Sequence, residues 1–128
     1  MNTLNSPQAP AAIGPYVQAK QFGDLVFLSG QLPIDAATGE MPASAGAQAT
    51  QSLANVAHIL ATVGLSAADV VKTTVFVKDL NDFAEINEAY AAFFAGTGTF
   101  PARSCIEVAR IPKDALVEIE VIAGVRRD

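Results

Sequence analysis

Apolar residues change their spacing along this chain, and each spacing predicts a different kind of element. Between residues 44 and 63 they recur at intervals of three and four, the pattern of an amphipathic helix, and Gly64 is a suitable C-cap. A second stripe of this period begins after Asn81 or Asp82, either of which can cap a helix, and ends by residues 96–98. The stripe positions are Leu53, Val56, Ala57, Leu60 and Val63 in the first helix, and Phe83, Ile86, Tyr90, Phe93 and Phe94 in the second.

Short runs of β-branched, aromatic and other apolar residues predict the strands. The run 25–28 is continuously apolar, as in a strand buried on both faces, and Gly23-Asp24 before it is a suitable turn. Residues 1–15 contain Pro7, Pro10 and Pro15 and are expected to form an irregular arm. The expected strands are 16–22, 25–28, 70–78, about 103–110 and about 116–125.

The expected elements follow in the order β-β-α-β-α-β-β, which predicts an α+β fold. Two amphipathic helices and one sheet pack best when both helices lie on the same face of the sheet. The other face then carries Lys72, Thr74, Phe76 and Glu120, a set too mixed to face only water. We expect a single domain over residues 1–128, with further subunits closing around the uncovered face.

Composition supports self-association and excludes several classes of function. Of the 128 residues, 51% are hydrophobic and 16% are charged, which leaves little polar material to coat a small monomer. The net charge of −5 argues against binding to a nucleic-acid backbone. No apolar run is long enough to cross a bilayer, and Met1–Asn5 lacks the features of a signal peptide, so a soluble cytoplasmic protein is expected. One cysteine and one histidine argue against a disulfide framework and a metal site.

Arg103 is the strongest candidate for chemistry. Strand alternation places Arg103, Cys105 and Glu107 on one face of their strand. A guanidinium holds a carboxylate through two parallel hydrogen bonds, which orients a small acid as well as attracting it. The structural alternative is an ion pair with Glu118 or Glu120 across the sheet.

Glu118 and Glu120 lie on a shared face of the last expected strand. Either carboxylate could act as a general base or hold a water molecule if it lay near the arginine. The second carboxylate would raise the pKa of the first by repulsion, whereas Arg103 would lower it. Position alone does not choose between the two glutamates, and both could be ordinary surface residues.

Three further positions are candidates for ligand contact. Asn87 lies at the edge of the second apolar stripe, where an amide is either a ligand contact or a structural clip, and the clip is favoured. Tyr16 follows Gly14-Pro15 and could form an aromatic pocket wall or pack in the core. Ser29 and Gly30 end a buried strand, a position from which backbone N–H groups often reach ligands.

Cys105 invites interpretation as a nucleophile, which would require a nearby base such as histidine. The single histidine, His58, falls with Gln51, Asn55 and Thr62 on the polar side of the first helix, and we interpret it as a solvated residue. A Cys–His pair is therefore not expected, and phosphate-binding, metalloprotease and serine-hydrolase motifs are absent from the sequence.

Taken together, these segments resemble the RidA family, also called YjgF/YER057c/UK114. The likeness runs from about residue 9 to residue 123, and its most specific part is the Pro-Ala-Arg-Ser-Cys block with the later Val-Glu-Ile. The match is to the archetypal, deaminase-type branch of the family. The segments that carry it are Gly14-Pro15-Tyr16, Leu28-Ser29-Gly30-Gln31, 72–80, Asn87, 100–105 and 117–120.

The resemblance implies a fold, an assembly and a reaction. The fold would be chorismate-mutase-like, with a single six-stranded mixed sheet and two helices on one face. The subunits would form a homotrimer with sites between neighbours. The reaction would be hydrolysis of reactive 2-imino or enamine acids, such as 2-iminobutanoate and 2-iminopropanoate, to 2-oxo acids and ammonia. It would need no metal or organic cofactor and would protect pyridoxal-phosphate enzymes from these species.

The resemblance also implies roles for individual residues. Arg103 would grip the substrate carboxylate, and Glu118 would position or activate the attacking water. Cys105 would complete the catalytic set by lining the pocket and offering its backbone carbonyl. The remaining substrate-binding residues would be Tyr16, Ser29, Gly30 and Asn87.

Other functions are compatible with the residues alone. A non-catalytic module could bind small acids such as 2-oxo acids through the same Arg103 pocket. A ribonuclease or translation-inhibitor activity, associated with some relatives, is disfavoured by the acidic composition. A holdase chaperone would use the apolar excess, which oligomerisation explains better.

Overall fold

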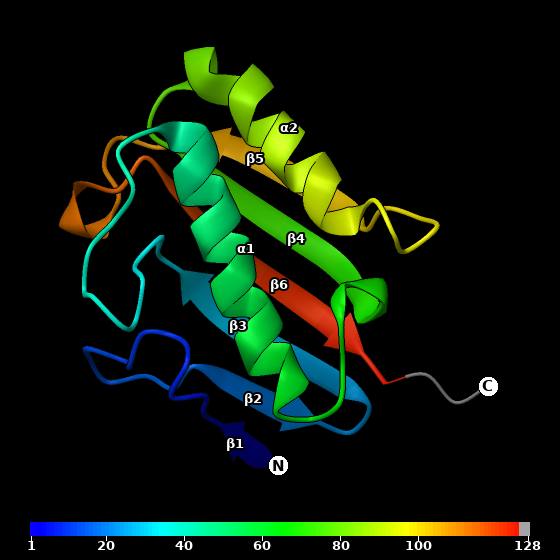
Figure 1. Ribbon diagram of the computed structural model, residues 1–128. Helices are drawn as coiled ribbons and strands as arrows, with labels where there is room; N and C mark the ends of the chain where they lie inside the picture. Colours follow the sequence, from blue (N-terminus) through cyan, green and yellow to red (C-terminus); the bar gives the residue numbers. More distant parts are fainter. Residues whose placement is uncertain (126–128) are drawn as a thin grey trace.

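A computed structural model describes residues 1–125 as one six-stranded sheet with two helices across one of its faces (Figure 1). The strands are β1 (Asn2–Leu4), β2 (Ala19–Phe22), β3 (Leu25–Gln31), β4 (Val70–Val77), β5 (Ala102–Glu107) and β6 (Val117–Gly124). The helices are α1 (Ala45–Ala61) and α2 (Phe83–Phe94), and short 3-10 turns cover Ala67–Asp69, Leu80–Asp82 and Pro112–Asp114. No helix in the described residues is long and apolar enough to span a membrane.

The strand order β1-β2-β3-β6-β4-β5 confirms the expected mixed α+β sheet. All neighbours pair antiparallel except β4 and β5, which run parallel because α2 forms the crossover between them. The last strand, β6, lies between β3 and β4. β5 pairs only with β4 and forms an edge of the sheet, so one side of its backbone has no partner strand within the described residues.

The N-terminal arm differs from its expectation. Residues 1–15 were expected to be irregular, but residues Asn2–Leu4 form β1 and pair with β2. The order β-β-α-β-α-β-β named five strands, and β1 is the sixth. Residues 5–15 contain no strand, as expected, because proline cannot donate a backbone hydrogen bond to a sheet. The strand expected from residue 16 begins only at Ala19.

Local signals account for the helix ends. Ser44 caps α1, its hydroxyl accepting a hydrogen bond from the Ala47 N–H at 3.2 Å. Gly64 follows α1 with a φ of 72°, a left-handed conformation that suits glycine. The second helix begins after Asp82, as expected, but the Asp82 side chain makes no capping bond. Asp79 instead caps the preceding 3-10 turn by accepting from the Asn81 N–H at 2.8 Å.

The core lies between the helices and the sheet. The apolar stripe of α1 is confirmed, with Leu53, Val56 and Leu60 all buried. The expected polar side of this helix is wrong at Asn55, which is fully buried. Its amide donates to the backbone oxygens of Leu32 and Ile34, both at 2.9 Å, so the loop after β3 replaces solvent there.

The opposite face of the sheet is covered by no helix within the described residues (Figure 1). Strand alternation and register place the side chains of Lys72, Thr74 and Glu120 on this open face, where Lys72 donates to Ser104 at 2.8 Å. Leu25, Phe27 and Ile106 also point to this side, each more than 40% exposed. An apolar surface of this kind on a small subunit is typical of an interface.

Candidate active site

Arg103 lies on edge strand β5 and points to the helix side of the sheet, where side chains of α2 hold it. Its Nη1 donates to Asn87 Oδ1 at 2.6 Å. Its guanidinium carbon lies 4.8 Å from the Tyr90 ring centroid and 5.4 Å from that of Phe83. A hydrogen bond combined with cation–π contacts limits the rotation of the guanidinium. Asn87 is therefore a clip, but one that holds the arginine rather than a loop.

Tyr90 is itself anchored beneath the arginine. Its hydroxyl shares a hydrogen bond of 2.7 Å with the Thr73 hydroxyl on β4, and the residue is only 5% exposed. Burial raises the pKa of the Tyr90 phenol, which keeps it neutral. The sequence placed Tyr90 in an apolar stripe and gave no sign of this role. Its i+3 spacing from Asn87 is the signal that could have linked the two.

A surface pocket opens beside this cluster. Asn87, Tyr90 and Arg103 line it together with Ala91, Phe100 and Pro101. An arginine has more N–H donors than the one given to Asn87, so the guanidinium can still receive a carboxylate here.

Glu118 lies on β6 and points to the open face, packed against the backbone of β3. A Cβ built on Gly30 would fall 2.9 Å from both Cδ and Oε2 of Glu118, closer than real side chains approach. Only glycine therefore leaves room for the carboxylate in this position. Burial raises the pKa of Glu118, and repulsion from Glu120 raises it further.

The Glu118 pocket collects most of the other candidates. Tyr16, Ser29 and Gly30 line it with both glutamates. Ile13, Leu32 and Pro112 complete the lining. This pocket brings together residues from the arm, β3 and β6.

The structural alternative for Arg103, an ion pair with Glu118 or Glu120 across the sheet, is wrong. Thr73 of β4 is the register partner of Arg103, so the two side chains lie on the same face of the sheet. Thr73 is buried beneath the helices, which places Arg103 on the helix side. Glu118 and Glu120 project to the open face. Across the described residues, the one ion pair within 4.0 Å joins Arg110 and Asp114. Within one chain, Arg103 and the carboxylates of Glu118 and Glu120 therefore lie on opposite faces of the sheet.

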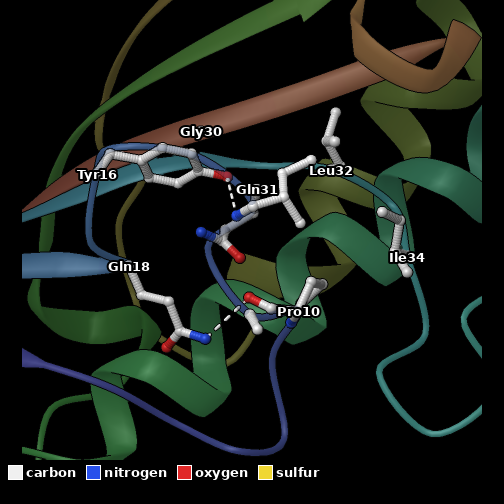
Figure 2. A pocket seen from close by; sticks show the side chains of 9 residues that line it. Pro10, Tyr16, Gln18, Gly30, Gln31, Leu32 and Ile34 are labelled. Carbon is white, nitrogen blue, oxygen red and sulfur yellow. Dashed lines mark hydrogen bonds between the residues drawn. The ribbon is translucent and has the colours of Figure 1, made fainter.

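Tyr16 is a wall residue rather than a core residue. Its side chain is 48% exposed, and its hydroxyl accepts a hydrogen bond from the Ile13 N–H at 3.4 Å (Figure 2). Ser29 uses its hydroxyl within the chain, donating to the Val17 oxygen at 2.6 Å. This bond and the backbone bond from the Ser29 N–H to the Gln18 oxygen at 2.9 Å tie the residues after Tyr16 to the end of β3, next to Gly30.

Cys105 lies two residues after Arg103 on the same face and is partly buried. Burial raises the pKa of the Cys105 thiol, and the nearby guanidinium only partly offsets this. A raised pKa favours the thiol over the nucleophilic thiolate. No group of three potential metal-binding His, Cys, Asp or Glu side chains occurs in the described part of the chain.

The fold agrees with the family that the sequence motifs resemble. A family model described as Endoribonuclease L-PSP matches residues 6–125, and the chain belongs to this family, which includes the RidA proteins. The chain is 59% identical to the 2-iminobutanoate/2-iminopropanoate deaminase of Escherichia coli strain K12, over 98% of each chain. It is 61% identical to a RutC family protein of Haemophilus influenzae, over 94% of each.

A solved structure agrees with the described fold. The crystal structure of Escherichia coli TdcF with bound serine superposes with a TM-score of 0.95 at 52% identity. The match covers 99% of this chain and 100% of that one. The six-stranded arrangement is therefore that of its relatives.

Proposed function

We propose that this protein hydrolyses 2-imino acids, such as 2-iminobutanoate and 2-iminopropanoate, to 2-oxo acids and ammonia. The strongest support is the 59% sequence identity, over 98% of the chain, to a relative named for this activity. The observation that carries the proposal within the structure is an oriented arginine and an unpaired, half-buried glutamate, each lining a pocket. These are the two groups that a small imino acid and an attacking water require.

Arg103 binds the substrate carboxylate in this proposal. The clip from Asn87 and the ring of Tyr90 fix the guanidinium before substrate arrives, so less conformational entropy is lost on binding. Cys105 lies two residues further along the same face of β5 but is not among the residues that line the Arg103 pocket, so its proposed part is limited to its backbone carbonyl on the edge strand.

Glu118 holds and activates the water. The water oxygen adds to C2 of the protonated imine while one of its protons passes to the Glu118 carboxylate, forming a tetrahedral carbinolamine. Glu118 then gives this proton to the amino nitrogen, and the C–N bond breaks as the C2 carbonyl forms. The remaining hydroxyl proton passes to the Glu118 carboxylate and leaves with ammonia as ammonium. A raised pKa makes Glu118 a stronger base than an ordinary glutamate. Because an imine carbon is already electrophilic, these steps require no cofactor.

The remaining site residues shape the pocket. Tyr16 forms its wall, and Ser29 and Gly30 line it from the end of β3. Gly30 has the additional property of leaving room for Glu118.

We infer that a homotrimer assembles each complete site from two neighbouring subunits. The supporting observation is the separation of Arg103 and Glu118 on opposite faces of the sheet in one chain. The exposed apolar residues of the open face supply a surface for the second copy. In this arrangement one subunit contributes the arginine and its neighbour the glutamate.

The proposed setting is the cytoplasm, with small imino and oxo acids as ligands. A nucleic-acid partner is not part of the proposal, since the net charge is −5. A binding module for 2-oxo acids would use the same arginine and is distinguished by the absence of turnover.

A coupled assay tests the function. Threonine dehydratase generates 2-iminobutanoate, semicarbazide traps it, and the protein is added. We expect faster formation of 2-oxobutanoate and less semicarbazone with the wild type and with Arg110→Ala, a control at an exposed arginine. Arg103→Ala should lose about 100-fold or more in kcat/KM. No effect of the wild type would contradict the proposal, and titration with 2-oxobutanoate would then test the binding module.

A further inference from the structure

A second hollow adjoins the Glu118 pocket and has no part in the roles proposed above (Figure 2). The two share Ile13, Tyr16, Gly30 and Leu32, so they meet over the Gly30 backbone. The hollow extends away from Glu118, between the arm and the segment that follows β3. Its other lining residues are Pro10, Ala11, Gln18, Gln31 and Ile34.

A buried amide fixes the arm side of this hollow. Gln18 is 3% exposed, and its Nε2 donates to the backbone oxygens of Pro10 at 2.9 Å and Ser6 at 3.1 Å. Its Oε1 accepts from the Ser6 N–H at 2.7 Å. Because these groups have no other element to pair with, Gln18 determines the path of the arm past the hollow.

A second buried amide fixes the opposite side. Asn55 on α1 donates to the backbone oxygens of Leu32 and Ile34, while its Oδ1 accepts from Gln51 Nε2 at 2.9 Å. The backbone at Leu32 and Ile34 is therefore held by a helix of the core. With both walls fixed, the hollow is a preformed feature, which lowers the entropic cost of filling it.

The lining of the hollow selects for uncharged groups. It contains no Lys, Arg, Asp, Glu or His among the described residues. Pro10, Ala11, Leu32 and Ile34 provide apolar surface. Just outside it, Glu118 and Glu120 repel a negatively charged side chain.

We propose that this hollow is the subsite for the substrate side chain and that it selects aliphatic over acidic 2-imino acids. The inference rests on the proposed function. With C2 of the substrate beside Glu118, the side chain leaves the Glu118 pocket past the residues that the two hollows share and enters between Tyr16 and Leu32. Apolar burial then adds to transition-state binding only for chains long enough to reach the hollow.

The size of the effect follows from apolar transfer. Each methylene that leaves water for the hollow raises kcat/KM by about fourfold. The imine of 2-aminobutanoate should therefore exceed that of alanine by about fourfold, and the imine of norvaline by about 15-fold. The imines of aspartate and glutamate should fall below that of alanine.

A substrate panel with two variants tests the subsite. Amino-acid oxidases of matching specificity generate each imine in the presence of semicarbazide, and the fall in semicarbazone gives kcat/KM. Ala11→Leu fills the hollow, and Ile34→Asn makes it polar; both positions line the hollow but not the Glu118 pocket. Ala47→Leu, an exposed alanine on α1, is the matched control.

The outcomes separate the two proposals. We expect both variants to keep the rate with the alanine imine within about twofold and to lose most of the gain per methylene. Ala47→Leu should keep the wild-type gain. Turnover by the wild type with no dependence on side-chain length, or equal losses on all imines in Ala11→Leu, would overturn the subsite and leave the function standing. No turnover of any imine would overturn both.

Discussion

The Arg103 and Glu118 sides of the candidate site are built in opposite ways. Arg103 is held by neighbours in its own chain, with a hydrogen bond to Asn87 and aromatic rings on α2. Glu118 has no ion-pair partner within the described residues; it is half-buried, packed on a glycine, and repelled by Glu120. One side is satisfied and oriented, whereas the other is desolvated and unpaired.

This difference assigns distinct work to the two sides. An oriented cation binds an anion well but does not move protons at neutral pH, since arginine stays charged. A carboxylate with a raised pKa is poorly placed to bind an anion but suited to take up a proton. Changes on the arginine side should therefore act mainly on KM, and changes on the glutamate side mainly on kcat.

The largest effect expected on the glutamate side is that of Glu118→Gln. The amide keeps the shape of the carboxylate but cannot accept a proton, so kcat should fall about 100-fold while 2-oxobutanoate binding persists. Steady-state kinetics and isothermal titration measure the two quantities. Glu88→Gln, at an exposed position of α2, should match the wild type. Loss of ligand binding together with kcat would argue against the division of roles.

Gly30→Ala should have the next largest effect. The added methyl group must displace the Glu118 carboxylate, since its Cβ would lie 2.9 Å away, and kcat should fall about 30-fold. Gly96→Ala is the matched control, because a Cβ there meets nothing within 4 Å. Thermal unfolding of both variants checks that each remains folded. Unchanged kcat in folded Gly30→Ala would show that the position of Glu118 is unimportant.

Asn87→Ala tests the arginine side with a smaller effect. Loss of the 2.6 Å hydrogen bond frees the guanidinium to rotate, so KM should rise about tenfold with kcat nearly constant. Initial rates over a range of imine concentrations give both parameters. A fall in kcat at constant KM would place Asn87 in the chemical step instead.

The smallest effect concerns pH. Activity that needs ionised Glu118 falls as pH drops through its raised pKa. Because Glu120 contributes to that raised pKa, Glu120→Gln should lower it and move the acid limb of the kcat profile to lower pH. The profile of kcat against pH measures this shift. A limb that stays in place would mean that another group controls it.

Sequence reasoning predicted most of the fold because the apolar periods of α1, α2 and the inner strands are strong. It missed β1, a three-residue strand in a proline-containing arm whose pairing with β2 is a tertiary effect. It also misjudged Asn55, since a polar residue opposite an apolar stripe is normally solvated, and only the loop after β3 buries it.

The site was predicted as a set of residues but not as an arrangement. Strand alternation correctly grouped Arg103 with Cys105 and Glu118 with Glu120. It could not tell which face of the sheet each strand turns toward the helices, because that depends on the register of β4 with both neighbours. The support of Arg103 by Tyr90 was likewise invisible, since an aromatic residue in a helix stripe is usually core.

Complementation between inactive variants tests most directly whether the two sides come from different subunits. Arg103→Ala and Glu118→Gln are mixed in equal amounts, dissociated and reassembled, and imine hydrolysis is measured. If a neighbour supplies Glu118 to the Arg103 of the next subunit, random assembly leaves about a quarter of the sites intact, and about a quarter of wild-type activity should return. A mixture of fully reassembled protein that stays as inactive as its parents would contradict the account.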